Sequence, residues 1–197
     1  MGRIMRGLAQ KTYGRHEHRH RFSLWAAARA TQRGLCDVDT LAEALENCGV
    51  ERFLRSADLN AIGRSGFDKR HREWCRSVVR FLKARGLRKA TFGHAAKLLG
   101  MYLKSMVVLG PDFGTAFARV AHPPIDGILL SELSSSDEIK CGHRHAWGKV
   151  RWTQLDEAGY YALVEELRSC AAADEPFWKL ERFWRVTKTQ RHKTQLQ

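Results

Sequence analysis

The spacing of apolar residues in the middle of this chain is the feature that most limits its fold. Between residues 71 and 82 the buried-type side chains recur three residues or one residue apart, at His71, Trp74, Cys75, Val78, Val79 and Leu82. This repeat places them on one face of an α-helix, and the following Arg85-Gly86 is a typical helix end. No segment shows the alternation of apolar and polar residues that indicates a half-buried strand. The sequence therefore predicts an all-α fold, a compact helical domain.

Further helices are predicted on both sides of this one, and 197 residues suffice for a single domain with a real core. The expected ranges are 22–33, 38–48, 51–67 (a short helix and a turn), 92–109, 125–133, 153–167 and 176–184. The run Thr153-Gln-Leu-Asp156 resembles a capping box, and Pro176 suits the first turn of the last helix. Residues 141–152, rich in His, Gly and Trp, are expected to be irregular.

The charge of the chain indicates a polyanionic partner. Lys and Arg number 34 against 21 Asp and Glu, which gives a formal net charge of +13 and a pI near 10.0. Basic residues gather at both ends, so we expect a basic arm at 1–20 and a basic tail at 186–197. Nucleic acid is expected ahead of a membrane surface, and a merely solvated surface is the plainer alternative. No apolar stretch approaches the roughly 20 residues of a membrane span.

Cysteine and histidine are the candidate metal ligands, and neither forms a complete set. The five cysteines are odd in number and unclustered, which favours reduced thiols in the cytosol. Two dense runs, His16-x-His18-x-His20 and Cys141-x-His143-x-His145, lack a second ligand pair at the spacing of typical zinc sites. We therefore expect no metal, no cofactor and a cytoplasmic protein.

Lys97 and Asp126 are the candidate catalytic residues. Lys97 lies about one turn into the helix expected to start near Phe92, where the helix dipole and lost hydration favour a neutral amine. Such an amine is a nucleophile that can form a Schiff base. Lys104 follows two turns later on the same face. Asp126 ends the run His122-Pro-Pro-Ile-Asp, where it either caps the next helix or acts beside the lysine.

The stretch 92–130 resembles the helix-hairpin-helix DNA glycosylase superfamily, in its lysine-using branch of 8-oxoguanine glycosylases of the archaeal type. Lys97 matches the lysine at the front of the second hairpin helix, and Asp126 matches the aspartate that closes a Pro-[Val/Ile]-Asp element. The chain is also similar to a small bacterial group that acts against phages by removing glucosylated hydroxymethylcytosine from DNA. It departs from the superfamily pattern because only Gly93 precedes the lysine, and it lacks the four-cysteine pattern of the iron–sulfur members.

The resemblance implies a monomeric enzyme that cleaves the N-glycosidic bond of a modified base flipped out of double-stranded DNA. Lys97 would attack C1′ or lie beside the attacking water, and Asp126 would stabilise the cationic sugar. The product is an abasic site, with strand cleavage where a Schiff base forms. The candidates for contact with the base are His94, His122, Trp25, Trp74 and Lys104, and those for contact with the DNA backbone are Arg88, Lys89 and Gly93.

Two other functions stay open. Arg88 and His94 fit the Arg-x4-6-His pattern of HEPN-type ribonucleases, which are also all-helical. A non-catalytic DNA-binding protein, with Lys97 as a phosphate contact, is the third interpretation. For Trp25 and Trp74 the helical pattern favours a place in the core over a place in the base pocket.

Overall fold

The computed structural model describes residues 13–172 and 174–185, and all regular structure in these ranges is helical. The elements in chain order are α1 (Arg15–Thr31), α2 (Val38–Cys48), α3 (Val50–Ser56), α4 (Arg64–Ala84), α5 (Phe92–Leu103), η1 (Lys104–Val108), α6 (Ala116–Val120), α7 (Gly127–Ser135), α8 (Arg144–Trp147), η2 (Trp152–Gln154), α9 (Glu157–Cys170) and η3 (Phe177–Phe183). The predicted compact all-α class is confirmed for this part of the chain. The tail 186–197 and most of the predicted basic arm lie outside it.

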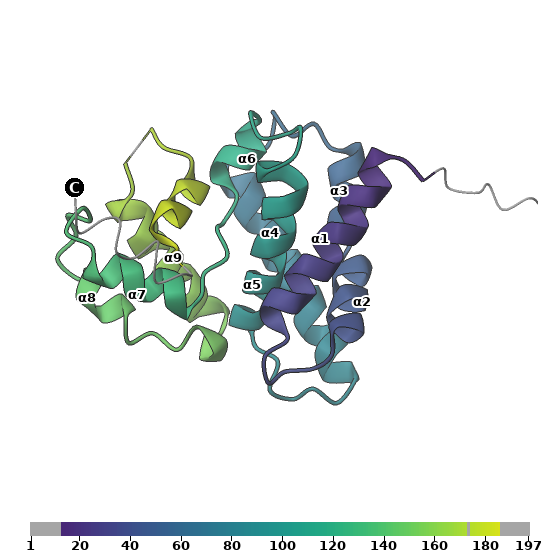
Figure 1. The fold of residues 1–197 in the computed structure, drawn as a ribbon, viewed down its shortest axis with the longest axis horizontal. Coiled ribbons are helices and arrows are strands. Elements are labelled where there is room, and N and C mark those ends of the chain that lie inside the picture. Colours follow the sequence, from purple (N-terminus) through teal and green to yellow (C-terminus); the bar gives the residue numbers. More distant parts are fainter. Residues whose placement is uncertain (1–12, 173, 186–197) are drawn as a thin grey trace, which may run out of the picture.

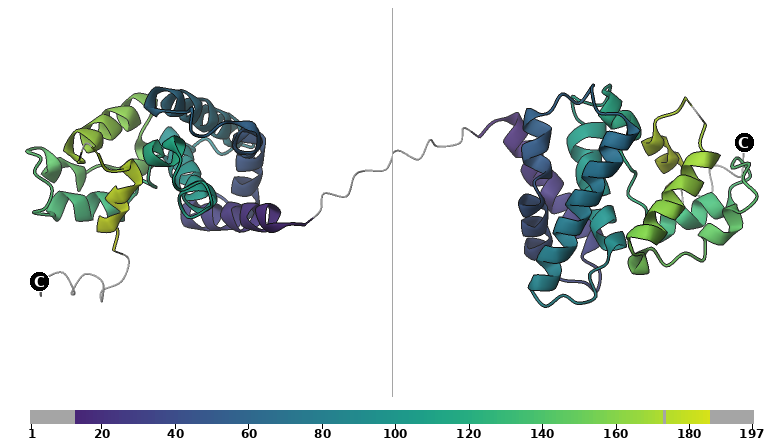
Figure 2. Two further views of the ribbon diagram at one scale, coloured as in Figure 1. Left: turned by 90° about the horizontal axis from the view of Figure 1, so that it is seen from above. Right: turned by 180° about the vertical axis from the view of Figure 1, so that it is seen from behind.

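The helices form two groups that lie side by side (Figure 1). We call α1 to α6, with η1, the first lobe, and α7 to α9, with η2 and η3, the second lobe. Both views of Figure 2 show the same division. One set of buried apolar side chains extends through both lobes, and α5 of the first lobe packs against η2 and α9 of the second. No helix in the described ranges is both long and apolar enough to cross a bilayer.

Helix α5 is the buried centre of this arrangement. All of its residues except Met101 are buried, and most of them are apolar or small. Two glycines let segments of the second lobe reach its backbone. A Cβ on Gly93 would lie 1.9 Å from the carbonyl oxygen of Trp152, and a Cβ on Gly100 would lie 3.0 Å from the Cα of Pro124. A Cβ at position 93 would overlap the carbonyl, and a Cβ at position 100 would require the Pro123-Pro124 backbone to shift by a few tenths of an ångström.

A buried polar network also joins the two lobes. His122, between α6 and α7, has its Nδ1 3.0 Å from the hydroxyl of Tyr160 and its Nε2 3.0 Å from Oδ1 of Asp68. Arg168 of α9 donates to both oxygens of Asp68, at 2.7 and 2.8 Å. Burial alone would raise the pKa of Asp68, but hydrogen bonds from Arg168 and His122 hold it well below its ordinary value. Charged Asp68 and Arg168 thus link α4 to α9 through paired, hydrogen-bonded groups.

The helix boundaries differ from the predicted ones in several places. α1 begins at Arg15, so the predicted arm 1–20 is partly helical. Asp156, not Thr153, caps α9, because its side chain accepts from the amide of Gly159 at 2.8 Å. The helix predicted over 92–109 changes to a π-helical turn at Lys104, and α6 was not predicted at all. These differences arise from local hydrogen bonds that apolar periodicity does not encode.

We expect the free energy of unfolding to fall as the pH is lowered from 6.5 toward 4. Burial lowers the pKa of His122 from 6.5 to about 4, although its hydrogen bond to Asp68 acts in the opposite direction. In this window the unfolded chain takes up a proton that the folded chain does not, so stability is fully present above pH 6.5 and is lost below it. The contribution of one histidine is at most about 1.4 kcal/mol per pH unit. Buried His71, whose pKa burial also lowers, adds in the same direction.

Urea unfolding followed by tryptophan fluorescence at several pH values measures this slope. The substitution His122→Gln should flatten it, whereas His145→Gln, at an exposed position of α8, should leave it unchanged. Equal slopes in the wild type and His122→Gln would contradict the assignment.

Candidate active site

Lys97 and Asp126 meet between the two lobes. The Nζ of Lys97, on α5, lies 3.1 Å from Oδ2 of Asp126, which immediately precedes α7. Lys97 is 9% exposed and Asp126 is 6% exposed, so bulk water screens their attraction only weakly. The structure therefore brings together the two residues that the sequence singled out, across 29 positions of chain.

The carboxylate of Asp126 is held in one orientation by the start of α7. Its Oδ1 accepts hydrogen bonds from the backbone amides of Ile128 and Leu129, both at 3.0 Å. Its other oxygen, Oδ2, is the one that faces Lys97. The two interpretations of this residue, helix cap and partner of the lysine, therefore hold together, because each uses a different oxygen.

The segment before Asp126 reaches the lysine because α5 carries a glycine at the crossing. The backbone of Pro123-Pro124 passes so close to Gly100 that a Cβ there would lie 3.0 to 3.3 Å from three backbone atoms. Two consecutive prolines fix φ and stiffen this segment. A small residue one turn after Lys97 and a stiff segment beside it together set the position of Asp126.

Trp152 is a third member of the site that sequence reasoning missed. The Nζ of Lys97 lies 4.7 Å from the centre of its ring, a cation–π distance, and the ring also contacts the position of Gly127. Its backbone carbonyl occupies the space next to Gly93 that a side chain there would fill. The residue lies in the segment that we expected to be irregular, where neither periodicity nor a motif distinguishes one tryptophan from another.

A second lysine, carboxylate and tryptophan lie further along the same face. The Nζ of Lys104 is 2.5 Å from Oε1 of Glu181 and 5.4 Å from the ring centre of Trp184. Burial raises the pKa of Glu181, and the charge of Asp126 raises it further, while Lys104 opposes both. The influence of Asp126 indicates that the two pairs are electrostatic neighbours. Glu181 and Trp184 were also missed, since the predicted final helix gave no sign of which way its side chains point.

His94 is the predicted base-contact residue that lies beside the pair. Its ring meets the ring of Trp152 edge-on at 5.6 Å, and its Nδ1 lies 2.8 Å from the hydroxyl oxygen of Thr91. Burial lowers the pKa of His94, and the charge of Lys97 lowers it further. The imidazole is therefore favoured in its neutral form next to the amine.

The other predicted base-contact residues lie elsewhere. Trp74 is buried with its ring against Phe53, as the alternative core prediction had it. The same core prediction is wrong for Trp25, which is 54% exposed, because α1 buries its opposite face around Leu24 and Ala28. His122 belongs to the polar network with Asp68, where it joins the lobes rather than facing the pair.

Of the residues predicted to contact the DNA backbone, two are accessible and one is not. Arg88 and Lys89 are exposed in the turn between α4 and α5. The prediction for Gly93 is wrong, because its amide donates to the carbonyl of Leu155 at 3.0 Å and is thus not available to a phosphate. Arg88 lies on the wall of a groove of about 710 Å³. Its charged lining residues are Arg76, Arg80, Lys83 and Arg88 together with Glu73, Asp156 and Glu157. Within the described ranges no ion pair engages Arg80, Lys83 or Arg88.

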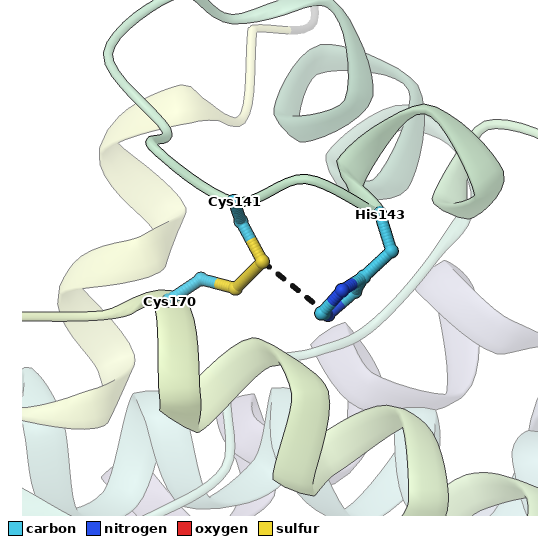
Figure 3. A group of neighbouring side chains, drawn as sticks. All are labelled: Cys141, His143 and Cys170. Carbon is cyan, nitrogen blue, oxygen red and sulfur yellow. Dashed lines mark hydrogen bonds between the residues drawn. A yellow bond between two sulfur atoms is a disulfide. The ribbon is translucent and has the colours of Figure 1, made fainter.

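The cysteines are less scattered than the sequence suggested. Cys141 and Cys170, 29 residues apart, are joined as a disulfide, and the ring of His143 lies beside them (Figure 3). The expectation of unclustered, reduced thiols is therefore wrong for this pair. Cys36, Cys48 and Cys75 are free, and burial raises the pKa of Cys48 to about 12 and that of Cys75 well above its ordinary value. Neither of these two thiols suits a nucleophilic role.

We expect Gly93→Ala to lower the free energy of unfolding by about 1–3 kcal/mol, the usual range for overpacking. The added Cβ would meet the Trp152 carbonyl at 1.9 Å, and neither of the two backbones can yield without moving Trp152 away from Lys97. Urea unfolding measures the destabilisation. The matched control is Gly66→Ala, an exposed helical glycine whose nearest neighbour is a side-chain atom at 3.4 Å. Equal stability of the two variants would contradict the close approach.

The comparisons leave the relationship of the chain to other proteins open. No family model, no curated protein and no solved structure matches it. What the site can do is therefore argued from its own geometry.

Proposed function

We propose that this protein is a DNA N-glycosylase that uses Lys97 and Asp126 to release a modified base. The observation that carries the proposal is the 3.1 Å contact between the amine and the carboxylate at the junction of the lobes. A lysine and an aspartate are the two groups needed to substitute the base at C1′ of a nucleotide. The resemblance of residues 92–130 to lysine-using glycosylases points to the same pair.

The chemistry follows from the arrangement of the two groups. The amine of Lys97 loses a proton, and Oδ2 of Asp126 lies close enough to accept it. The bond from Nζ to C1′ then forms as the N-glycosidic bond breaks. The base departs with the bonding electrons and takes up the proton that Asp126 accepted, which restores the carboxylate. Oδ1 of Asp126 stays with the α7 amides throughout, so the carboxylate keeps its orientation beside the cationic sugar. The sugar–lysine adduct opens to a Schiff base, from which strand cleavage can follow.

Trp152 and His94 are the proposed contacts of the flipped base. Both rings lie beside Lys97, and Trp152 is only partly buried. A flat aromatic face is the natural surface on which an unstacked base packs. The cation–π contact of Lys97 with the Trp152 ring would be exchanged for contact with the sugar as the nucleotide enters. Lys104 with Glu181 would then border the same space from the second pair.

The DNA backbone is proposed to follow the cations on one wall of the groove beside the start of α5. Arg80, Lys83 and Arg88 line this groove together with Thr91, the residue that caps α5. Cations without a carboxylate partner in the described structure are the ones that phosphates can recruit at least cost. The +13 charge of the whole chain supports the same partner.

The substrate proposal covers two classes of base, glucosylated hydroxymethylcytosine and 8-oxoguanine. The ribonuclease alternative is less favoured, because His94 is buried and hydrogen-bonded to Thr91 while Arg88 is exposed on the groove. A non-catalytic DNA-binding protein needs the groove but leaves the buried amine and carboxylate without a task.

We expect Lys97→Ala and Asp126→Asn each to reduce base release by at least about 100-fold. The assay is mass detection of free base from duplexes that carry 8-oxoguanine and from DNA that carries glucosylated hydroxymethylcytosine. Asp126→Asn keeps an oxygen to cap α7, so its loss of activity reports on the charge. Borohydride should trap a protein–DNA adduct with the wild type and not with Lys97→Ala.

The control is Lys69→Ala, which removes an exposed lysine of α4 and should keep both base release and the adduct. Circular dichroism confirms that each variant is folded. Full base release by folded Asp126→Asn, or an undiminished adduct with Lys97→Ala, would reject the proposed roles. Failure of the wild type to release either base would reject both substrate classes.

We also expect the triple substitution of Arg80, Lys83 and Arg88 by alanine to weaken duplex binding and to lower the slope of log K against log salt by about 3, one unit for each phosphate that the variant no longer binds. Fluorescence anisotropy over a salt series measures both quantities. The control is Arg182→Ala, an exposed arginine already paired with Glu175 at 2.6 Å, which should change neither much. An unchanged salt slope in the triple variant would place the DNA elsewhere.

A further inference from the structure

Outside the site described above, Cys141, His143 and Cys170 form a separate cluster in the second lobe (Figure 3). One ligand atom from each residue lies within 4.8 Å of the other two. Cys141 and His143 belong to the segment between α7 and α8, and Cys170 is the last residue of α9. The cluster therefore joins an irregular segment to the end of a well-packed helix.

We propose that in the reduced protein Cys141, His143 and Cys170 bind a zinc ion. Thiolates and imidazoles are typical ligands of zinc, whereas magnesium and calcium bind oxygen ligands. A fourth position would be filled by a solvent molecule, because His143 is exposed. The site is a cross-link rather than part of the proposed glycosylase chemistry, and it rests on none of the roles given to Lys97 and Asp126.

The position of His143 is the evidence that separates a metal site from a simple disulfide. Its Nε2 lies 3.3 Å from Sγ of Cys141. Zinc bonds of ~2.3 Å to sulfur and ~2.0 Å to nitrogen in a tetrahedron put the two ligand atoms about 3.5 Å apart. A disulfide alone needs no third ligand at this place. The Cα atoms of Cys141 and Cys170 lie 5.7 Å apart, so both thiolates can reach one ion from the present backbone.

The surroundings of the cluster support a fixed cross-link. His143 meets the ring of Trp147 edge-on at 6.1 Å, and the Nε1 of Trp147 donates to Oε2 of Glu166 at 2.9 Å. Glu166 lies on α9 one turn before Cys170. This chain of contacts holds the histidine over the end of α9, in the way that outer-shell groups orient metal ligands. The segment 136–151 contains only the one-turn helix α8, so its own backbone contributes little to holding it in place.

The metal and the disulfide are alternative states of the same two sulfur atoms. When a disulfide such as oxidised glutathione accepts two electrons from the two thiolates, the Cys141–Cys170 bond forms, zinc is released and two glutathione thiolates leave, which take up protons from water. Reduction of the bond restores the two thiolates. The cluster therefore clamps the segment to α9 in either state, and only the reduced state holds metal.

The test is the zinc content of the full chain, purified with a non-thiol reductant, loaded with zinc and freed of excess metal. We expect about one zinc per chain in the wild type and a cobalt-substituted form with a thiolate charge-transfer band. Cys141→Ser and Cys170→Ser should lose the metal. His143→Ala should bind it at least about tenfold more weakly, since even loss of an outer-shell partner has that effect.

Matched controls come from the same residue types nearby. His145→Ala, two residues from His143 and exposed, and Cys36→Ser, at a free cysteine of the first lobe, should keep the wild-type zinc content. His143→Ala retains both cysteines, so it should fold even if the serine variants do not. A reduced wild type without zinc, or undiminished zinc affinity in His143→Ala, would overturn the site and leave a structural disulfide. Base release serves as a separate readout, because loss of zinc with retained base release separates this proposal from the proposed glycosylase activity.

Discussion

The ion pair of Lys97 and Asp126 lies where the two lobes meet, and the proposed site depends on how the surrounding contacts hold it. It takes two charged groups out of water, which costs more free energy than a simple attraction returns unless other contacts compensate. Here they do, since two amides of α7 bind one oxygen of Asp126 and the ring of Trp152 covers the ammonium. Replacement by apolar residues of similar size would serve stability as well or better. The proposed release of a base would give the pair a use that stability alone does not.

The position of that pair depends on two glycines of α5, which have no side chain at the points where other segments cross the helix. Its two glycines admit the carbonyl of Trp152 at one end and the Pro123-Pro124 backbone near the other, and Lys97 lies between these crossings. A larger side chain at either place would separate the lobes at the site. The network of His122, Asp68 and Arg168 holds the lobes together on another side without touching the pair. One set of contacts therefore fixes the distance between lobes, and the other fixes the geometry of the amine and carboxylate.

Helical periodicity predicted most of the fold because burial of one face is a local property of the sequence. The range of α2 and the C-terminal end of α4 agree with it closely, and α5 starts at the expected Phe92. Lys97 and Asp126 could be found because each stands in a recognisable local pattern. Trp152, Glu181 and the partner of Cys141 could not, since their roles come from packing between segments far apart in sequence. Trp25 was predicted to be buried and is exposed. Helix α1 has two partly apolar faces, and only its neighbours decide which one is buried.

Two sets of a lysine, a carboxylate and a tryptophan lie along α5 and η1, one around Lys97 and one around Lys104. They have similar residues, but the carboxylates are held by different groups. Asp126 is fixed by backbone amides, whereas the described hydrogen bond to Glu181 comes from the side-chain ammonium of Lys104. Burial raises the pKa of Glu181 and the neighbouring charge of Asp126 raises it further, although Lys104 opposes both. The two pairs therefore differ in how firmly each carboxylate is held, and among the described contacts only that of Asp126 is fixed by backbone amides.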